Sequence, residues 1–343
     1  SLEKTSDGGY IASGYSRGAG GDVSNNEGFH DFWIVKFTAS GDLQWEKSYG
    51  FAGSDKAYKV IQTKDGGYIA AGVLDVTASN GEGGLGSNRS SQDLGRSVQH
   101  AGGDYWVIKL SASGQLQWRN YFGGTFTDTA YDIIQVSDGT YLVYGTSDSN
   151  DVDISGNIGT YDYWVVKVSV NGEMLWEKNY GGTQIENLYT ATIAQDGSFV
   201  MFGDTRSDDE NVSSNFGKAD IWGVKIDADG ALLSQQSYGG SEFESARGIT
   251  SLTNGNFIVT GNTRSIEGDF TENNGDNDAL VMLIDDNLNI EFQLTLGGST
   301  FDFAQSAIEA ENNTYVIAGS TQSNDKDIPQ NRGVEDLLLF KIK

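Results

Sequence analysis

Acidic and polar side chains recur at alternate positions in a long segment near the middle of the chain. Asp151, Asp153 and Ser155 stand two residues apart, and a further acid, Asp162, follows eleven residues after the first. Calcium prefers six to eight oxygen ligands, and this spacing is similar to that of an EF-type loop, with Gly156 at the sharp turn and Asp instead of Glu at the twelfth position. The segment therefore predicts a calcium site made by these four side chains, and calcium is the only cofactor that the sequence indicates. The alternative is that the same side chains cap loop amides in Asx-turns.

Five further acids recur along the chain, each directly before a segment that is typical of a β-strand. They are Asp55, Asp128, Glu186, Glu244 and Asp302, and three of them follow an apolar residue, Ile185, Phe243 or Phe301. We expect these carboxylates to ring the mouth of a central channel and, with their apolar neighbours, to bind a cation or a basic ligand. The alternative is that each acid caps the amides of a turn or ties neighbouring repeats together.

Side chains for nucleophilic or zinc chemistry are scarce. The sequence has no Cys and two His, His30 and His100, which lie in long polar segments without the spacing of zinc ligands. No pattern of Ser, His and Asp is typical of a hydrolase triad. Carboxylates are abundant, but none of the possible pairs is singled out for glycoside hydrolysis. The residues therefore favour a protein that is not an enzyme.

The repeating structure of the chain follows from an aspartate that opens an apolar run. It occurs six times, at Asp31, Asp104, Asp162, Asp220, Asp278 and Asp336. The first spacing is 73 residues and the other four are 58, so a unit of 58 residues occurs six times with one insertion of 15. Such a period indicates a repeat architecture.

The insertion, within residues 80–103, is the one break in this regularity. It contains Gly81-x-Gly83-x-x-Gly86, but it lacks the preceding strand and following helix of a dinucleotide site. It also contains polar and basic residues, namely Asn88, Arg89, Arg96 and His100. We expect either a surface for a specific partner or a tolerated surface insertion.

Each unit reads as four short strands joined by Asp-Gly or Asn-Gly turns, which supply the positive φ angles of tight hairpins. In the third unit the strands are expected at residues 130–136, 141–145, 163–168 and 174–180. The fourth strand occurs five times, so we expect the last unit to have three strands and a flanking segment to supply the outer one. The chain opens at Ser1 in the middle of the pattern, and we expect it to be a mature or trimmed fragment.

Six such units predict an all-β chain with one domain over residues 1–343. The expected fold is a six-bladed β-propeller of four-stranded antiparallel blades, with the last blade lacking its outer strand. All seven tryptophans stand at two repeat positions, Trp33, Trp106, Trp164 and Trp222 in the third strand and Trp45, Trp118 and Trp176 after it. A sheet of this size does not bury both faces alone, so we expect these rings to pack between blades.

Composition excludes several classes of protein. The chain of 343 residues is 37% hydrophobic and 11% aromatic, which is enough for a core and excludes disorder. It has 22 Lys and Arg against 48 Asp and Glu, a net charge of −26, which argues against a nucleic-acid partner. No apolar run of about 18 residues is present, so no membrane insertion is expected. We expect a monomer.

The repeat D-G-G-Y-I-x-x-G-x-[ST], followed by D-x-W-V-V-K-L-x-x-x-G-x-L-x-W-x-x-x-Y-G-G-[ST], resembles that of secreted bacterial β-propeller proteins, the SBBP-type family. The resemblance covers all six units, and its motifs are structural. It implies a propeller and a secreted or cell-surface location, and it implies no reaction. Residues 114–118 are also similar to quinoprotein propeller repeats, but only over that strand.

Taken together, these features predict a non-catalytic binding or scaffolding module. The long acidic loops would lie on one propeller face and bind a protein or carbohydrate ligand there, because rigid scaffolds present function on loops. The alternative is a polysaccharide-acting hydrolase or lyase that uses carboxylates on the same face.

Overall fold

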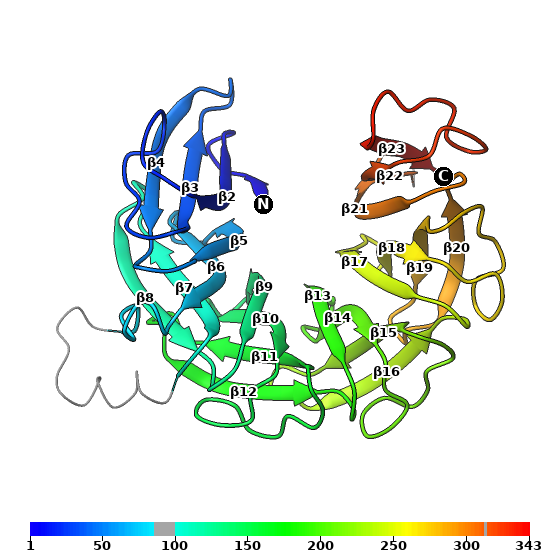
Figure 1. The fold of residues 1–343 in the computed structure, drawn as a ribbon, viewed down its shortest axis with the longest axis horizontal. Helices are drawn as coiled ribbons and strands as arrows, with labels where there is room; N and C mark the ends of the chain where they lie inside the picture. The colour runs from blue at the N-terminus through cyan, green and yellow to red at the C-terminus, as the bar shows by residue number, and fades with distance from the viewer. Residues whose placement is uncertain (86–99, 312–313) are drawn as a thin grey trace. The chain divides into compact units, whose positions relative to one another are not determined.

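The computed structural model describes residues 1–85, 100–311 and 314–343, and the chain forms two compact units, residues 1–180 and 181–343. Figure 1 shows each unit as a series of small twisted sheets. Over the described residues there are six sheets, three in each unit, and every one is an antiparallel meander in which strands adjacent in sequence are paired. No described segment forms a helix long and apolar enough to cross a membrane.

The first unit contains three four-stranded sheets. Their strands are β1 (Leu2–Lys4), β2 (Tyr10–Ser16), β3 (Asp31–Phe37) and β4 (Leu43–Tyr49); β5 (Lys56–Gln62), β6 (Tyr68–Asp75), β7 (Gly103–Leu110) and β8 (Leu116–Phe122); and β9 (Asp128–Gln135), β10 (Tyr141–Ser147), β11 (Asp162–Val168) and β12 (Met174–Tyr180).

The second unit contains two four-stranded sheets and one of three strands. Their strands are β13 (Glu186–Ile193), β14 (Phe199–Thr205), β15 (Asp220–Ile226) and β16 (Leu232–Tyr238); β17 (Glu244–Ser251), β18 (Phe257–Thr263), β19 (Asp278–Ile284) and β20 (Ile290–Leu296); and β21 (Asp302–Ala310), β22 (Thr314–Thr321) and β23 (Asp336–Ile342).

These sheets confirm the predicted all-β class and the prediction that the sheet occurs six times. The last sheet has three strands, as expected. The arrangement is consistent with a β-propeller. The strand boundaries differ slightly from expectation. Strand β9 begins at Asp128, two residues before the predicted start, and β11 begins at Asp162, because both acids pair with Ser147 across the sheet. The acids are therefore the first residues of their strands and not the last residues of loops.

Two tryptophans of the third strands, Trp106 and Trp164, pack between neighbouring sheets of the first unit, as predicted. Trp106 meets Phe32 of the preceding sheet with ring centroids 4.6 Å apart, and Trp164 meets Tyr105 at 4.4 Å. Both indoles are fully buried. Edge-to-face and tilted aromatic pairs at these distances add to the free energy gained from burial.

A buried lysine on the third strand anchors the first hairpin of a sheet. Lys109 lies 2.9 Å from Asp65, and Lys225 lies 3.2 Å from Asp196 at the same repeat position. Burial opposes ionisation of Asp65, but hydrogen bonds from Thr63, Lys109 and a backbone amide lower its pKa to about 2. A buried ammonium group needs such a partner. In the fifth sheet both members are replaced together, by Leu283 and Asn254.

The first strand of five sheets carries a β-bulge at one repeat position, three residues after the acid that precedes or opens the strand. The bulged residues are Tyr58, Tyr131, Tyr189, Arg247 and Gln305, and each is skipped in the pairing with the second strand. A bulge inserts one unpaired residue and re-aims its side chain. The fold therefore repeats a position at which the side chain is free of the sheet ladder.

The glycine of the second strand faces this bulge. A methyl group on Gly261 would lie 2.1 Å from the carbonyl oxygen of Ser245, whereas a methyl group on Gly14 would meet nothing within 4 Å. The difference arises because β1 has only three residues and pairs no further along β2 than Ala12. The glycine of the I-x-x-G motif is thus required where the backbone of the bulged strand approaches closely.

We predict that Gly261→Ala lowers the free energy of unfolding by about 1–3 kcal/mol, the usual cost of overpacking. Gly14→Ala at the same repeat position should change it by less than about 0.5 kcal/mol. Thermal and denaturant unfolding followed by circular dichroism would measure both changes. Equal stability of the two variants would contradict the role assigned to the bulge.

Candidate functional site

The five acids expected to ring a channel are buried inside the loops that join neighbouring sheets. Asp55, Asp128, Glu186, Glu244 and Asp302 are all 1% exposed or less. Each accepts a hydrogen bond from the backbone N–H four residues earlier, at 2.8–3.0 Å. These contacts are those of the capping alternative, because the side chains turn back to satisfy loop amides that would otherwise be unpaired, and ligand binding by the five acids stays a prediction.

The apolar residues that precede three of these acids hold the same loops through their carbonyl groups. Ile185 accepts a hydrogen bond from the N–H of Arg206, Phe243 from that of Arg264, and Phe301 from that of Gln322. The rings of Phe243 and Phe301 lie 5.6 and 5.7 Å from the Arg264 guanidinium. Of the predicted ligand-binding residues, Phe243 and Glu244 line the cavity described below.

The buried acids form pairs at the junctions between sheets of one unit. Asp220, which opens β15, faces Glu244, which opens β17, and the same 24-residue spacing joins Asp278 to Asp302. Burial and the neighbouring carboxylate raise the pKa of Asp220 to about 7, and they raise that of Asp278 to about 6. A methyl group on Gly297 would lie 2.5 Å from Asp278 Oδ1 and 2.7 Å from Asp302 Oδ2. The glycine therefore leaves the space that the second pair occupies.

These pairs predict a fall in stability as the pH rises. A carboxyl group whose pKa is raised from 3.8 to about 7 in the folded chain stabilises the fold fully below pH 4, and this contribution is lost as the pH rises through 7. The melting temperature should therefore be higher at pH 5 than at pH 8. Asp220→Asn should raise the melting temperature at pH 8 and reduce its pH dependence, because an amide oxygen still accepts from the N–H of Phe216.

The exposed Asp229→Asn is the matched control, since it removes the same charge outside any such pair. Calorimetric melting at several pH values would decide the matter. A flat profile, or the same profile in Asp220→Asn and Asp229→Asn, would contradict the proposed protonation of the pairs.

The four residues of the predicted calcium site have different partners. Asp151 accepts from the N–H and hydroxyl of Thr125 at 2.9 and 2.8 Å, and Asp153 accepts from Gly123 N–H at 3.3 Å. Ser155 donates to Glu177, and Asp162 accepts from Ile158 N–H at 2.8 Å. In the part of the chain that the structure describes, no group of three His, Asp or Glu side chains could hold a metal ion. Calcium binding therefore stays a prediction, and the observed contacts are those of the capping alternative.

The same capping contact recurs in the other long loops. Asp209 accepts from Thr183 N–H at 2.8 Å, and Asp325 accepts from Ser299 N–H at 2.8 Å. These donors are the third residues of the Gly-Gly-[ST] motif, so the motif and the loop acids form one structural unit. The first acid of each of these loops therefore caps an amide of the Gly-Gly-[ST] motif.

The insertion lies only partly within the described residues, since residues 86–99, with Asn88, Arg89 and Arg96, fall outside them. His100 is buried, with Nδ1 2.5 Å from Asp104 Oδ2 and Nε2 3.8 Å from Asp153 Oδ2. His30 bonds Ser54 at 2.9 Å. Both histidines therefore hold the junctions between sheets of the first unit.

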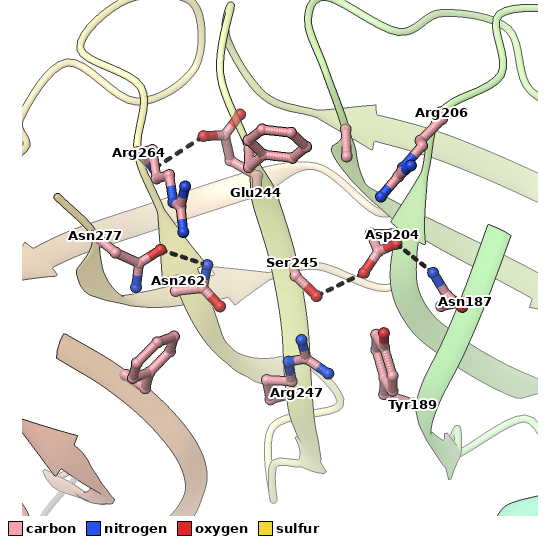
Figure 2. Close-up of a pocket in the computed structure, with 13 residues that line it drawn as sticks. Asn187, Tyr189, Asp204, Arg206, Glu244, Ser245, Arg247, Asn262, Arg264 and Asn277 are labelled. Carbon is pink, nitrogen blue, oxygen red and sulfur yellow. Dashed lines mark hydrogen bonds between the residues drawn. The ribbon is translucent and has the colours of Figure 1, made fainter. Parts of the chain in front are cut away.

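The second unit contains a cavity of about 350 Å³, and Figure 2 shows the residues that line it. Strands β13, β14, β17, β18 and β21 contribute most of its walls. The lining residues are Asn187, Tyr189, Asp204, Arg206, Ala219, Phe243, Glu244, Ser245, Arg247, Asn262, Arg264, Asn277 and Phe303. They come from a few repeat positions, among them the bulge position that holds Tyr189 and Arg247.

Three of the four arginines in residues 181–343 line this cavity, although the whole chain carries a charge of −26. Arg247 lies over the ring of Tyr189, with its guanidinium carbon 4.0 Å from the ring centroid. Figure 2 shows Arg206 and Arg264 on opposite sides of the strand that carries Glu244 and Ser245. Among the described residues, none of the three guanidinium groups makes a hydrogen bond or a salt bridge. The cavity therefore contains three guanidinium groups without a hydrogen-bonded partner in the described part of the chain.

The two carboxylates of the lining are already engaged. Asp204 accepts from Asn187 Nδ2 at 2.9 Å and from Ser245 Oγ at 2.8 Å. Burial raises its pKa from the ordinary value, while these hydrogen bonds and the nearby Arg247 and Arg206 oppose the rise. Glu244 accepts from Gly240, Thr263, Arg264 and Ser265 at 2.9–3.1 Å.

Sequence reasoning did not find this site, although a signal was present. Arg206 and Arg264 stand 14 residues before a strand-opening aspartate, the position that Arg17 holds in the first repeat. Arg247 replaces the tyrosine found at the bulge position of the three preceding repeats. Aligning the repeats and looking for departures in charge would have selected these residues.

No family model matches the chain, and no curated protein matches it. Among solved structures, a protein of unknown function from Dyadobacter fermentans is 12% identical, with a TM-score of 0.50 over 93% of this chain and 89% of that one. The Neurospora crassa Pan2 WD40 domain is 10% identical, with a TM-score of 0.49 over 86% of this chain and 72% of that one. A putative gluconolactonase is 10% identical, with a TM-score of 0.41 over 84% and 80%. The first of these similarities concerns the fold alone.

Proposed function

We propose that this protein is a non-catalytic binding module that takes a small ligand into the arginine-lined cavity of residues 181–343. In this proposal the six sheets are the blades of a six-bladed propeller of the SBBP-type family, and the protein works as a monomer outside the cell or at its surface. Two long loops frame the cavity, because the residues at their ends line it: Arg206 and Ala219 in one, Arg264 and Asn277 in the other.

The observation that carries the proposal is the set of three unsatisfied guanidinium groups around one hollow. Like charges repel, and a strongly acidic chain offers many carboxylates that could have paired with them. Arg206, Arg247 and Arg264 nevertheless make no salt bridge among the described residues. Such an arrangement gains free energy when an anionic group of a ligand enters.

The ligand is proposed to be a carbohydrate and not a protein surface. A volume of about 350 Å³ is at the lower end for small-molecule sites. Its walls combine rings such as Tyr189 and Phe303 with the side-chain amides of Asn187 and Asn262, which suit the apolar faces and hydroxyl groups of sugars.

The contacts of the carboxylates favour binding over hydrolysis. A glycosidase needs two carboxyl groups that face the bond to be cleaved, one of them as a proton donor. Glu244 is buried, and both of its carboxylate oxygens accept hydrogen bonds, Oε2 from Gly240 and Oε1 from Thr263, Arg264 and Ser265. Asp204 is the one other carboxylate of the lining.

Affinity electrophoresis in gels that contain a polysaccharide would test this function. We predict that at least one of four polymers, xylan, glucomannan, polygalacturonate or alginate, retards the protein and that no reducing or unsaturated ends are released. Arg247→Ala should abolish the retardation, since it removes an unsatisfied donor of the cavity. Arg332→Ala is the matched control, because it removes the same charge from an exposed position outside the cavity.

Three results would contradict the proposal. Release of sugar ends would favour the hydrolase or lyase instead. Retardation that survives in Arg247→Ala would place the binding surface elsewhere. No retardation by any of the four polymers would overturn the carbohydrate-binding function.

A further inference from the structure

We infer that the ligand of this cavity is a uronic acid residue, that is, a pyranose sugar bearing one carboxylate. The inference rests on the proposed function and adds the chemical class of the sugar. It follows from the charge balance of the lining, the aromatic rings that two of the arginines contact and the polar groups beside them.

The charge balance of the lining fits a single negative charge. Three arginines carry three positive charges, and Asp204 and Glu244 together carry two negative ones when ionised. One monovalent carboxylate therefore neutralises the cavity. A phosphate monoester, with a charge near −2, would leave an excess of negative charge beside Asp204.

Aromatic rings hold two of the guanidinium groups in place. Arg247 lies over Tyr189 at 4.0 Å, and Arg264 lies 5.6 Å from the centroid of Phe243 and 5.7 Å from that of Phe301. A guanidinium held by its face keeps its N–H edge available, and that edge matches the two oxygens of a carboxylate. A group held in this way also loses less side-chain entropy when the ligand binds.

Hydrogen bonds fix the polar groups that would meet the hydroxyl groups of the sugar. Asp204 accepts from both Asn187 and Ser245, and so orients two side chains of the wall. Asn262 donates to Asn277 Oδ1 at 2.8 Å on the opposite side, as Figure 2 shows. Side-chain amides carry both donors and acceptors, as the hydroxyl groups of a sugar require.

The pair of a tyrosine and an arginine at the bulge positions of the cavity differs from the residues at the same positions in the first unit. In the first unit the two bulge positions are Tyr58 and Tyr131, whose rings meet at 5.8 Å, where the cavity has Tyr189 and Arg247. The scaffold is the same at both places, so the arginine is a substitution on an existing platform. It converts an aromatic contact into a site with a cation held against a ring.

Isothermal titration calorimetry with matched ligands would test the inference. The probes are the trimers of galacturonate, mannuronate and guluronate and the methyl ester of each, which keeps the sugar ring and removes the charge. We expect at least one trimer to bind, its ester to bind about tenfold more weakly or worse, and the affinity to fall with added NaCl. Arg247→Ala and Arg264→Ala should weaken binding similarly, and the control Arg332→Ala should not.

Arg264→Lys adds a variant that keeps the charge. Because an ammonium group lacks the fork of two N–H donors, we expect it to restore only part of the lost affinity. The melting temperature of each variant would show that it is folded, and this is expected because the three arginine side chains are exposed.

The failures of the two proposals can be told apart. Equal binding of a trimer and its ester, or retardation by xylan or glucomannan alone, would overturn the uronic acid and leave the carbohydrate-binding module intact. Binding of inorganic phosphate in preference to every trimer would also overturn it. Retardation by none of the polymers, with no heat from any trimer, would overturn both proposals.

Discussion

The fold depends on carboxylates that accept hydrogen bonds from the backbone of their own loops. At each junction between sheets, an acid at the start of a first strand binds the N–H group four residues earlier, as Glu244 binds Gly240. A second acid, such as Asp220, does the same at the start of a third strand. Loops without regular structure leave many amides unpaired, and burying them unsatisfied would be costly. A chain with few prolines and many long loops therefore needs acids in its interior as well as on its surface.

This constraint has an electrostatic cost that the fold reduces by several means. Burial, together with the neighbouring carboxylate of Asp302, raises the pKa of Asp278 and so favours its protonated state. Gly297, which lies against both carboxylates, leaves the space that the two side chains need. At the opposite end of the strands the buried charge is positive, because a buried lysine such as Lys109 binds the aspartate of the hairpin. The repeat thus carries a separate charge arrangement at each end of its strands.

Much of the fold could be predicted because the same sequence unit occurs six times. The spacing of Asp104, Asp162 and Asp220 gives the period, the Asp-Gly turns give the hairpins, and the tryptophans give the faces that pack. The burial of Glu244 and its relatives could not be predicted, because an acid before a strand has the same pattern whether it binds a ligand or a loop amide. The cavity was missed for a different reason. Arg206 and Arg264 follow the ends of two strands in different repeats, and Arg247 lies inside a third strand, β17. The bulge that aims Arg247 has one sequence signal, Gly261 on the next strand.

At the bulge, the residue that makes room for the backbone and the residue whose side chain is displayed are two different residues. The space that Gly261 leaves is needed for the backbone of β17 and is independent of the side chain that the bulge displays. Accordingly, Tyr, Arg and Gln all occupy the bulged position in different repeats without any change in sheet pairing. The fold thus requires the glycine, while the bulged residue differs from one repeat to another. Such a chain can acquire new specificities through substitutions that leave its stability almost unchanged, one repeat at a time.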